Sequence, residues 1–179
     1  MVLNLMKNKK RILFCAVALC VAPYLPAQAT KQVTVNASVA EMLTLTVDAT
    51  NVTLAFVAAD YDTTTGLATK TAVKATTFSV SANRAWKLTV RPGDQFFTFT
   101  PNGTAVDPRK PVSTLAVRTG VVAFAPFSGV TEIPVATGTG GGYGKAGNVI
   151  PVDYQMQSSL ATDSPGAYVL TLTYTLAAL

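Results

Sequence analysis

The chain has 179 residues, and the first 29 are predicted to be an export signal, which leaves about 150 residues, the size of one domain. Four of its 14 Lys and Arg residues lie in that predicted signal. Ten then remain against nine Asp and Glu, and a net charge of +1 excludes the basic footprint of a nucleic-acid binder. The chain has no His, and both Cys residues precede residue 30, which excludes His-based catalysis and Cys-ligated metals in the mature chain. We therefore expect no enzyme, no cofactor and no metal site.

The N-terminus carries the three parts of a secretory signal in order. Residues 7–11 contain four basic side chains, residues 12–22 are an apolar run, and Ala27-Gln28-Ala29 is an A-x-A cleavage site. The apolar run of 11 residues is too short to cross a bilayer as a helix. We predict a signal peptide over 1–29 and a single exported domain over 30–179, with no membrane span after the signal is removed.

Cleavage after the A-x-A site is expected to leave Thr30 as the first residue of the mature protein. The intact mass of exported protein checks this expectation. A species that still contains Cys15 and Cys20 would contradict it.

The mature chain has the composition of a β-protein, with 26 Thr and 19 Val, whose branched side chains suit strands. Apolar and polar residues alternate with a period of two, which places one face on a core and the other in water. No segment shows a helical apolar stripe. The pattern predicts an all-β protein, an antiparallel immunoglobulin-like β-sandwich of about 8–10 short strands. The alternating segments are 33–39, 43–47, 52–56, 78–82, 86–90, 97–99, 115–125, 152–156 and 168–176.

Three polar or glycine-rich segments are predicted to be loops: 60–66, 101–111 and 138–147. In the first of them, Asp60 and Asp62 offer carboxylates of the kind that calcium binds, although no EF-hand spacing is present. Asp is equally common in solvated turns. The sequence leaves both interpretations of this segment open.

The only tryptophan, Trp86, is in phase with Leu88 on an alternating segment, which predicts a core position; a ring that faces a ligand is the alternative. Together with Tyr168, Leu172 and Tyr174 near the C-terminus, the W-x-L triplet resembles the two signatures of WxL-type surface domains. Tyr174 stands where that pattern has a second Trp. The resemblance implies a β-rich module that attaches to a cell wall, with a wall polysaccharide as its partner.

A second resemblance covers the alternating residues 31–39 at the mature N-terminus. It is similar to the first segment of colonization-factor type chaperone–usher pilins, which completes the sandwich of a neighbouring subunit. An extended segment can add to a sheet edge through backbone hydrogen bonds while alternate side chains fill pockets. The inserted side chains of such a donor strand would be Val33, Val35, Ala37 and Val39.

The same segment would look identical in sequence if it were the first strand of its own sandwich, because only the connectivity differs. The resemblance implies an exported structural or adhesive subunit of a fimbrium at the cell surface. Its partners would be copies of itself or another surface subunit. The WxL-like wall module is the alternative function.

Overall fold

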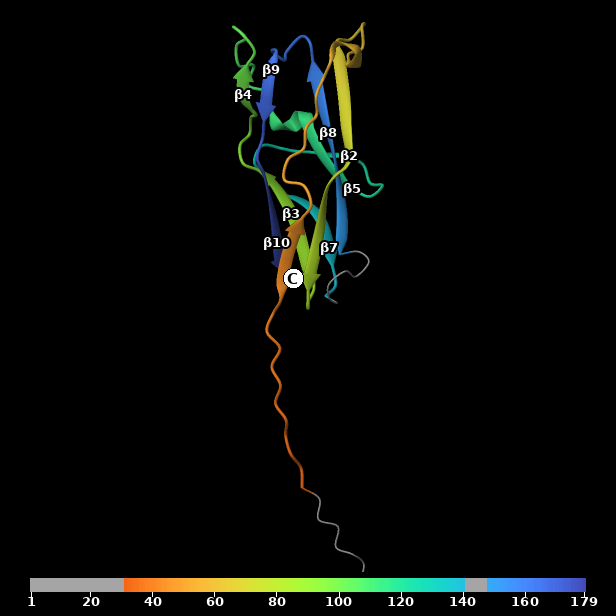
Figure 1. Cartoon of the computed structure of the whole chain (residues 1–179), viewed down its shortest axis with the longest axis vertical. Coiled ribbons are helices and arrows are strands. Elements are labelled where there is room, and N and C mark those ends of the chain that lie inside the picture. Colours follow the sequence, from red (N-terminus) through yellow and green to blue (C-terminus); the bar gives the residue numbers. More distant parts are fainter. Residues whose placement is uncertain (1–30, 141–147) are drawn as a thin grey trace, which may run out of the picture. The chain divides into compact units, whose positions relative to one another are not determined.

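The computed structural model describes residues 31–140 and 148–179 (Figure 1). The chain divides into two units, residues 1–38 and residues 39–179. Residues 31–38 of the first unit carry no helix or strand. The predicted signal peptide lies outside the described residues, so it remains a prediction.

The regular secondary structure of the second unit consists almost entirely of antiparallel strands, which confirms the predicted fold class. Two single turns of 3-10 helix, η1 (Ala58–Asp60) and η2 (Val112–Thr114), connect them. The strands are β1 (Leu43–Val47), β2 (Leu67–Ala82), β3 (Trp86–Pro92), β4 (Thr98–Pro101), β5 (Leu115–Thr119), β6 (Ala125–Pro126), β7 (Ile133–Gly138), β8 (Val149–Ser159), β9 (Gly166–Val169) and β10 (Leu172–Ala178).

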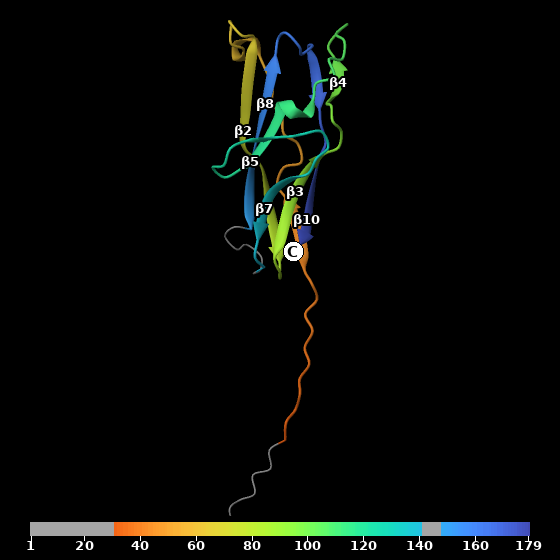
Figure 2. The same ribbon diagram turned by 180° about the vertical axis from the view of Figure 1, so that it is seen from behind.

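The strands form a five-stranded sheet in the order β1-β2-β8-β5-β6, a three-stranded sheet β10-β3-β7 and a two-stranded sheet β4-β9 (Figures 1 and 2). The order β1-β2-β8-β5 corresponds to strands A-B-E-D of an immunoglobulin domain, and the pair β3-β10 corresponds to C-F. An immunoglobulin domain places strand G beside F. In the described part of this chain, the outer side of β10 has no strand partner.

The core lies between the five-stranded and three-stranded sheets, because the alternating side chains of both point inward. Trp86, Leu88 and Val90 of β3 are all 0% exposed, which confirms the predicted core position of the tryptophan. The other buried members of this cluster are Phe78, Val80, Ala82, Phe97, Val112, Leu115, Val117, Phe127, Ile150, Val152, Tyr154 and Met156.

Several expected strands differ from the observed ones. Residues 31–42 carry no strand, and neither do residues 52–56, although Leu54 and Phe56 still pack against the core. The single strand expected over 115–125 is also divided, because a turn separates β5 from β6. The single strand expected over 168–176 is divided into β9 and β10, and the Gly93 N–H donates to the Thr171 carbonyl at 2.8 Å at the break.

A β-bulge interrupts the pairing of β2 with β8 between Ala72 and Thr76. At the bulge, Lys74 takes a left-handed φ of 49°, and its N–H donates to Asp153 Oδ1 at 2.7 Å. Arg118 Nε donates to the other carboxylate oxygen at 2.8 Å. The Lys74 N–H, followed by Arg118, holds the pKa of Asp153 below its usual 3.8.

Replacing Asp153 by Ala is expected to cost about 1–3 kcal/mol of stability, because it leaves the Lys74 N–H and the Arg118 guanidinium without this acceptor. The contribution of a carboxylate with a lowered pKa is complete above its unfolded value of 3.8 and is lost as the pH falls through the folded value. Urea unfolding at pH 7 and pH 3 measures both effects. Asp153→Asn, which keeps an acceptor for the Lys74 N–H, should lose less stability than Asp153→Ala. Equal losses of stability for the two variants would contradict this assignment.

Candidate functional site

The outer edge of β10, which we call the open edge, is the main unpaired feature of the sandwich. On its inner side β10 pairs antiparallel with β3 over seven residues, from Leu172 opposite Pro92 to Ala178 opposite Trp86. On its outer side it has no hydrogen-bonded strand within the described residues. An edge of this kind presents backbone N–H and C=O groups that can pair with another chain.

The core-facing side chains of the open edge are incompletely buried. Leu172, Tyr174 and Leu176 pack against the core but remain partly exposed. β1 lies beside β10 (Figure 1), and its inward side chains Leu43 and Leu45 are also only partly buried. One further strand at this edge would cover apolar surface that the chain itself leaves in contact with water.

The other edges are less suited to strand addition. β6 is two residues long, and β7 contains Pro134, which has no N–H to donate, and pairs irregularly with β3. β1 offers five residues, whereas β10 offers seven and contains no proline. The part of β2 that does not pair with β1, residues 67–76, is interrupted by the β-bulge between Ala72 and Thr76. The open edge is therefore the longest regular edge in the described part of the sandwich.

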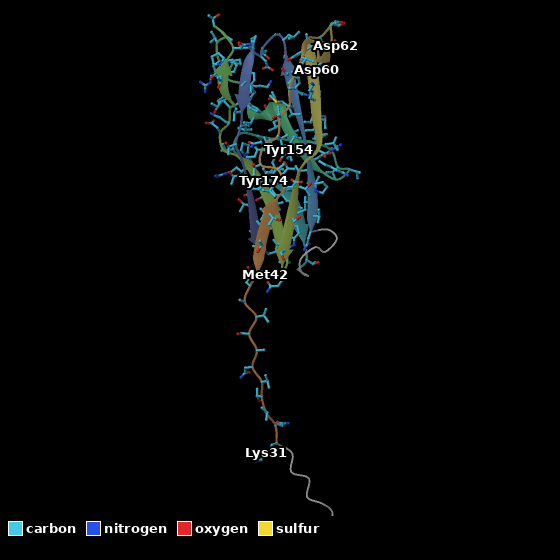
Figure 3. All side chains as sticks on the ribbon, in the orientation of Figure 1. Lys31, Met42, Asp60, Asp62, Tyr154 and Tyr174 are labelled. Carbon is cyan, nitrogen blue, oxygen red and sulfur yellow. The ribbon has the colours of Figure 1, made fainter. Side chains whose placement is uncertain are left out.

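A pair of tyrosines connects the open edge to the opposite sheet. The Tyr174 hydroxyl lies 2.7 Å from the hydroxyl of Tyr154 on β8, and the Tyr174 ring lies 4.2 Å from the ring of Phe78 on β2 (Figure 3). Burial, reinforced by the Tyr154 hydroxyl, raises the pKa of Tyr174 far above its usual 10.0. The pair fixes the position of β10 from the inside while its outer edge stays unpaired.

Replacing Tyr174 by Phe is expected to cost about 1–3 kcal/mol, because it leaves the Tyr154 hydroxyl without its partner. Since folding raises the pKa of Tyr174, the stability it contributes is complete below pH 10.0 and is lost as the pH rises toward the folded value. Thermal melts between pH 7 and pH 11 should show a steeper alkaline loss for the wild type than for the variant. The double variant Tyr154→Phe/Tyr174→Phe should recover part of the cost, and identical alkaline slopes would contradict the assignment.

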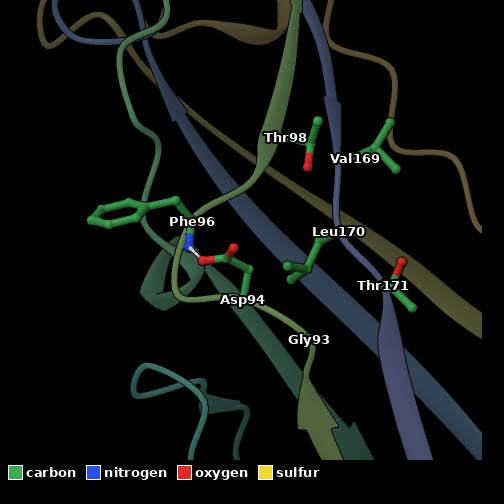
Figure 4. Close-up of a pocket in the computed structure, with 7 residues that line it drawn as sticks. All are labelled: Gly93, Asp94, Phe96, Thr98, Val169, Leu170 and Thr171. Carbon is green, nitrogen blue, oxygen red and sulfur yellow. Dashed lines mark hydrogen bonds between the residues drawn. The ribbon is translucent and has the colours of Figure 1, made fainter.

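A shallow pocket of about 240 Å³ lies where β9 and β10 separate, opposite the break between β3 and β4 (Figure 4). The carboxylate of Asp94 accepts hydrogen bonds from the N–H groups of Gln95 at 2.6 Å and Phe96 at 3.2 Å. Both hydrogen bonds go to Oδ1 and are made within the turn that contains Asp94. The pocket marks the point at which the regular part of the open edge ends.

The two halves of the WxL-like motif occupy different environments. Trp86 and Leu88 are fully buried, so neither the Trp86 ring nor the Leu88 side chain reaches the surface. Tyr168 of β9 donates its hydroxyl to the Ser164 carbonyl at 2.7 Å and packs beside Phe99. The remaining motif residues, Leu172 and Tyr174, lie on the open edge.

Asp60 and Asp62, which are labelled in Figure 3, have hydrogen-bond and ion-pair partners from the turn and from β2. Asp60 pairs with Lys70 at 2.8 Å, and Asp62 accepts from the N–H groups of Thr64 and Thr65 at 3.0 and 2.7 Å. Lys70 lowers the pKa of Asp60, and the Thr65 N–H lowers that of Asp62. The described residues contain no group of three metal-binding side chains, and the geometry favours the solvated turn.

The candidate donor residues are accessible. Val33, Val35 and Val39 are 84%, 83% and 86% exposed. Ala37, between them, is exposed as well. Exposed valines at alternate positions are available for burial against a partner.

Within the described residues, no helix is long and apolar enough to span a membrane. No protein-family model and no curated protein matches this chain.

Proposed function

We propose that this chain is an exported, pilin-like surface subunit that assembles with copies of itself by β-strand addition. Residues 33–39 of one copy would pair with the open edge of β10 in the next copy. The observation that carries the proposal is the open edge: a regular, proline-free strand edge with incompletely buried core residues beside it. The added strand takes the place that strand G has in an immunoglobulin domain.

The donor segment and the open edge match in length. Residues 33–39 are seven in number, and β10 also has seven residues. Antiparallel pairing is the arrangement of every strand pair among the described residues and is slightly more stable per residue than parallel pairing. Aligned end to end, the opposite pairs are Val39 with Leu172, Ala37 with Tyr174, Val35 with Leu176 and Val33 with Ala178.

This register also matches side chains by size. Ala37, the smallest of the four inserted residues, falls opposite Tyr174, the largest side chain of the edge, and directly opposite residues on one face of a sheet are in contact. Val33 falls opposite the small Ala178. Full burial of a valine contributes about 1.5–3 kcal/mol before the cost of ordering the segment is subtracted.

Polymer formation by purified mature protein tests the proposal. We expect ladders in SDS without boiling that collapse to monomer on heating. A synthetic peptide of residues 31–39, added in excess, should occupy open edges and shorten the polymers, whereas a peptide of the same composition in scrambled order should not. Mature protein that stays monomeric and sediments with purified peptidoglycan would contradict the proposal and favour the wall-binding module.

A further inference from the structure

The three residues that precede β1 are held by the turn between β2 and β3. The side-chain amide of Asn83 bonds to the backbone on both sides of residue 41: Oδ1 accepts from the Met42 N–H at 3.0 Å, and Nδ2 donates to the Ala40 carbonyl at 2.7 Å. The Asn83 N–H also donates to the Met42 carbonyl at 3.2 Å. Asn83 thus pairs with this short segment much as a neighbouring strand would.

The next residue of the turn connects the same segment to the end of the open edge. One guanidinium nitrogen of Arg84 lies 2.9 Å from the Glu41 carboxylate, and the other donates to the Leu179 carbonyl at 2.5 Å. Leu179 follows β10 directly, and its own N–H donates to the Ala85 carbonyl at 2.9 Å. Arg84 therefore joins the segment that leads into β1 with the end of β10.

We propose that Asn83 and Arg84, which we call the exit clamp, set the stiffness and the relative orientation of successive copies in the polymer. The inference rests on the proposed function, and the partner it concerns is a second copy of this chain. The last donor residue, Val39, is 86% exposed, and Ala40, the next residue, is already bonded to Asn83. A donor strand fixed in one copy is then followed by a fixed segment of its own copy, with no free residue between them.

Without the side chains of the exit clamp, residues 40 and 41 would form a linker between the donor strand and Met42, whose carbonyl still accepts from the Asn83 N–H. Each residue adds two soft backbone dihedrals, so two freed residues would turn a rigid joint into a flexible one. The exposed Arg84–Glu41 ion pair contributes little stability by itself. The amide of Asn83, with two backbone partners, is therefore the main positioning group.

Negative-stain electron microscopy of polymers from the double variant Asn83→Ala/Arg84→Ala tests the clamp. Polymers should still form, because the donor strand and the open edge are unchanged, and their persistence length should fall several-fold. The matched control Asn51→Ala/Arg91→Ala removes the same residue types from two other exposed positions and should leave the persistence length unchanged. Variant polymers as stiff as wild type would overturn the clamp and leave the proposed function standing.

Hydrogen exchange on the mature protein gives a second readout that needs no polymer. The Met42 amide should exchange slowly in the wild type and at least tenfold faster in Asn83→Ala. Asn83→Asp, which keeps the acceptor for Met42 and loses the donor to Ala40, should protect that amide and still give polymers of lowered stiffness. An unprotected Met42 amide in the wild type would overturn the clamp, while a wild type that never polymerises would overturn the proposed function along with it.

Discussion

Replacing Trp86 by Ala is expected to lower the free energy of unfolding by about 3–5 kcal/mol, as for other large buried aromatics. The ring is 0% exposed and lies between the sheets with Leu88 and Val90. The surroundings are closely packed: a Cβ added to Gly138 would lie 2.4 Å from the ring. Equilibrium unfolding in urea measures the loss.

Two further variants define this effect. The indole N–H of Trp86 has no hydrogen-bond partner within the described residues, so Trp86→Phe sacrifices no such bond and should cost clearly less than Trp86→Ala. Gly138→Ala should also destabilise, because its methyl group collides with the ring and neither group has room to move. An unchanged melting curve for Trp86→Ala, with loss of binding to a wall polymer, would move this residue to a surface site.

Replacing Val35 by Asp is expected to abolish polymer formation while leaving the melting temperature of the monomer nearly unchanged. In the proposed polymer, Val35 is buried against the open edge of another copy, and a charge placed in an apolar contact without a partner is costly. In the separate chain Val35 is 83% exposed, where an aspartate costs little. Size-exclusion chromatography and thermal melts of the variant measure the two effects separately.

The matched control is Thr34→Asp, one residue along on the opposite face of the donor strand, which should still polymerise because strand side chains alternate. If residues 33–39 instead formed the first strand of their own sandwich, Val35→Asp would lower solubility and thermal stability together. That result, combined with a wild type that never polymerises, would make the wall-binding module the preferred function.

Alternation of Val, Leu and Thr was sufficient to predict the strands that have one face on the core. β1, most of β3 and β10, and the middle of β8 fall within predicted segments, because apolar residues alternate along their inward faces there. The first half of β2 was missed, since residues 67–75 mix small and charged side chains and are held by the ladder to β8. β7 was missed because Pro134 lies within it.

The alternation of apolar and polar residues indicates which side chains are buried. It does not indicate which segments form hydrogen bonds with a neighbouring strand. Leu54 and Phe56 pack against the core as the pattern predicts, yet no ladder forms there. The division of the last strand depends on the contact between Gly93 and Thr171, which are 78 positions apart in the chain. No local pattern could predict a break set by so distant a residue.

The candidate site could be predicted only in part. The residues of the donor segment and of β10 were recognised because both alternate. That β10 is an unpaired edge follows from the order of the strands, which a single sequence does not reveal. No pattern in the sequence indicates the exit clamp, because Asn83 and Arg84 are ordinary turn residues and their partners lie about 40 positions away or more.

A disulfide cross-link between copies tests the central claim most directly. The only cysteines, Cys15 and Cys20, lie in the predicted signal, so engineered cysteines in the mature chain have no competing thiol. In the antiparallel register Ser38 falls opposite Thr173 on the outward face. The Cα atoms of such pairs lie about 4.5–5.5 Å apart, within the range of a disulfide.

The chain carrying Ser38→Cys and Thr173→Cys should therefore give, on mild oxidation, a covalent ladder that survives boiling and disappears on reduction. The chain carrying Thr34→Cys and Thr173→Cys, which would be opposite only in a parallel register, should not cross-link. A ladder from the second chain alone, or from neither, would contradict antiparallel strand addition at the open edge of β10.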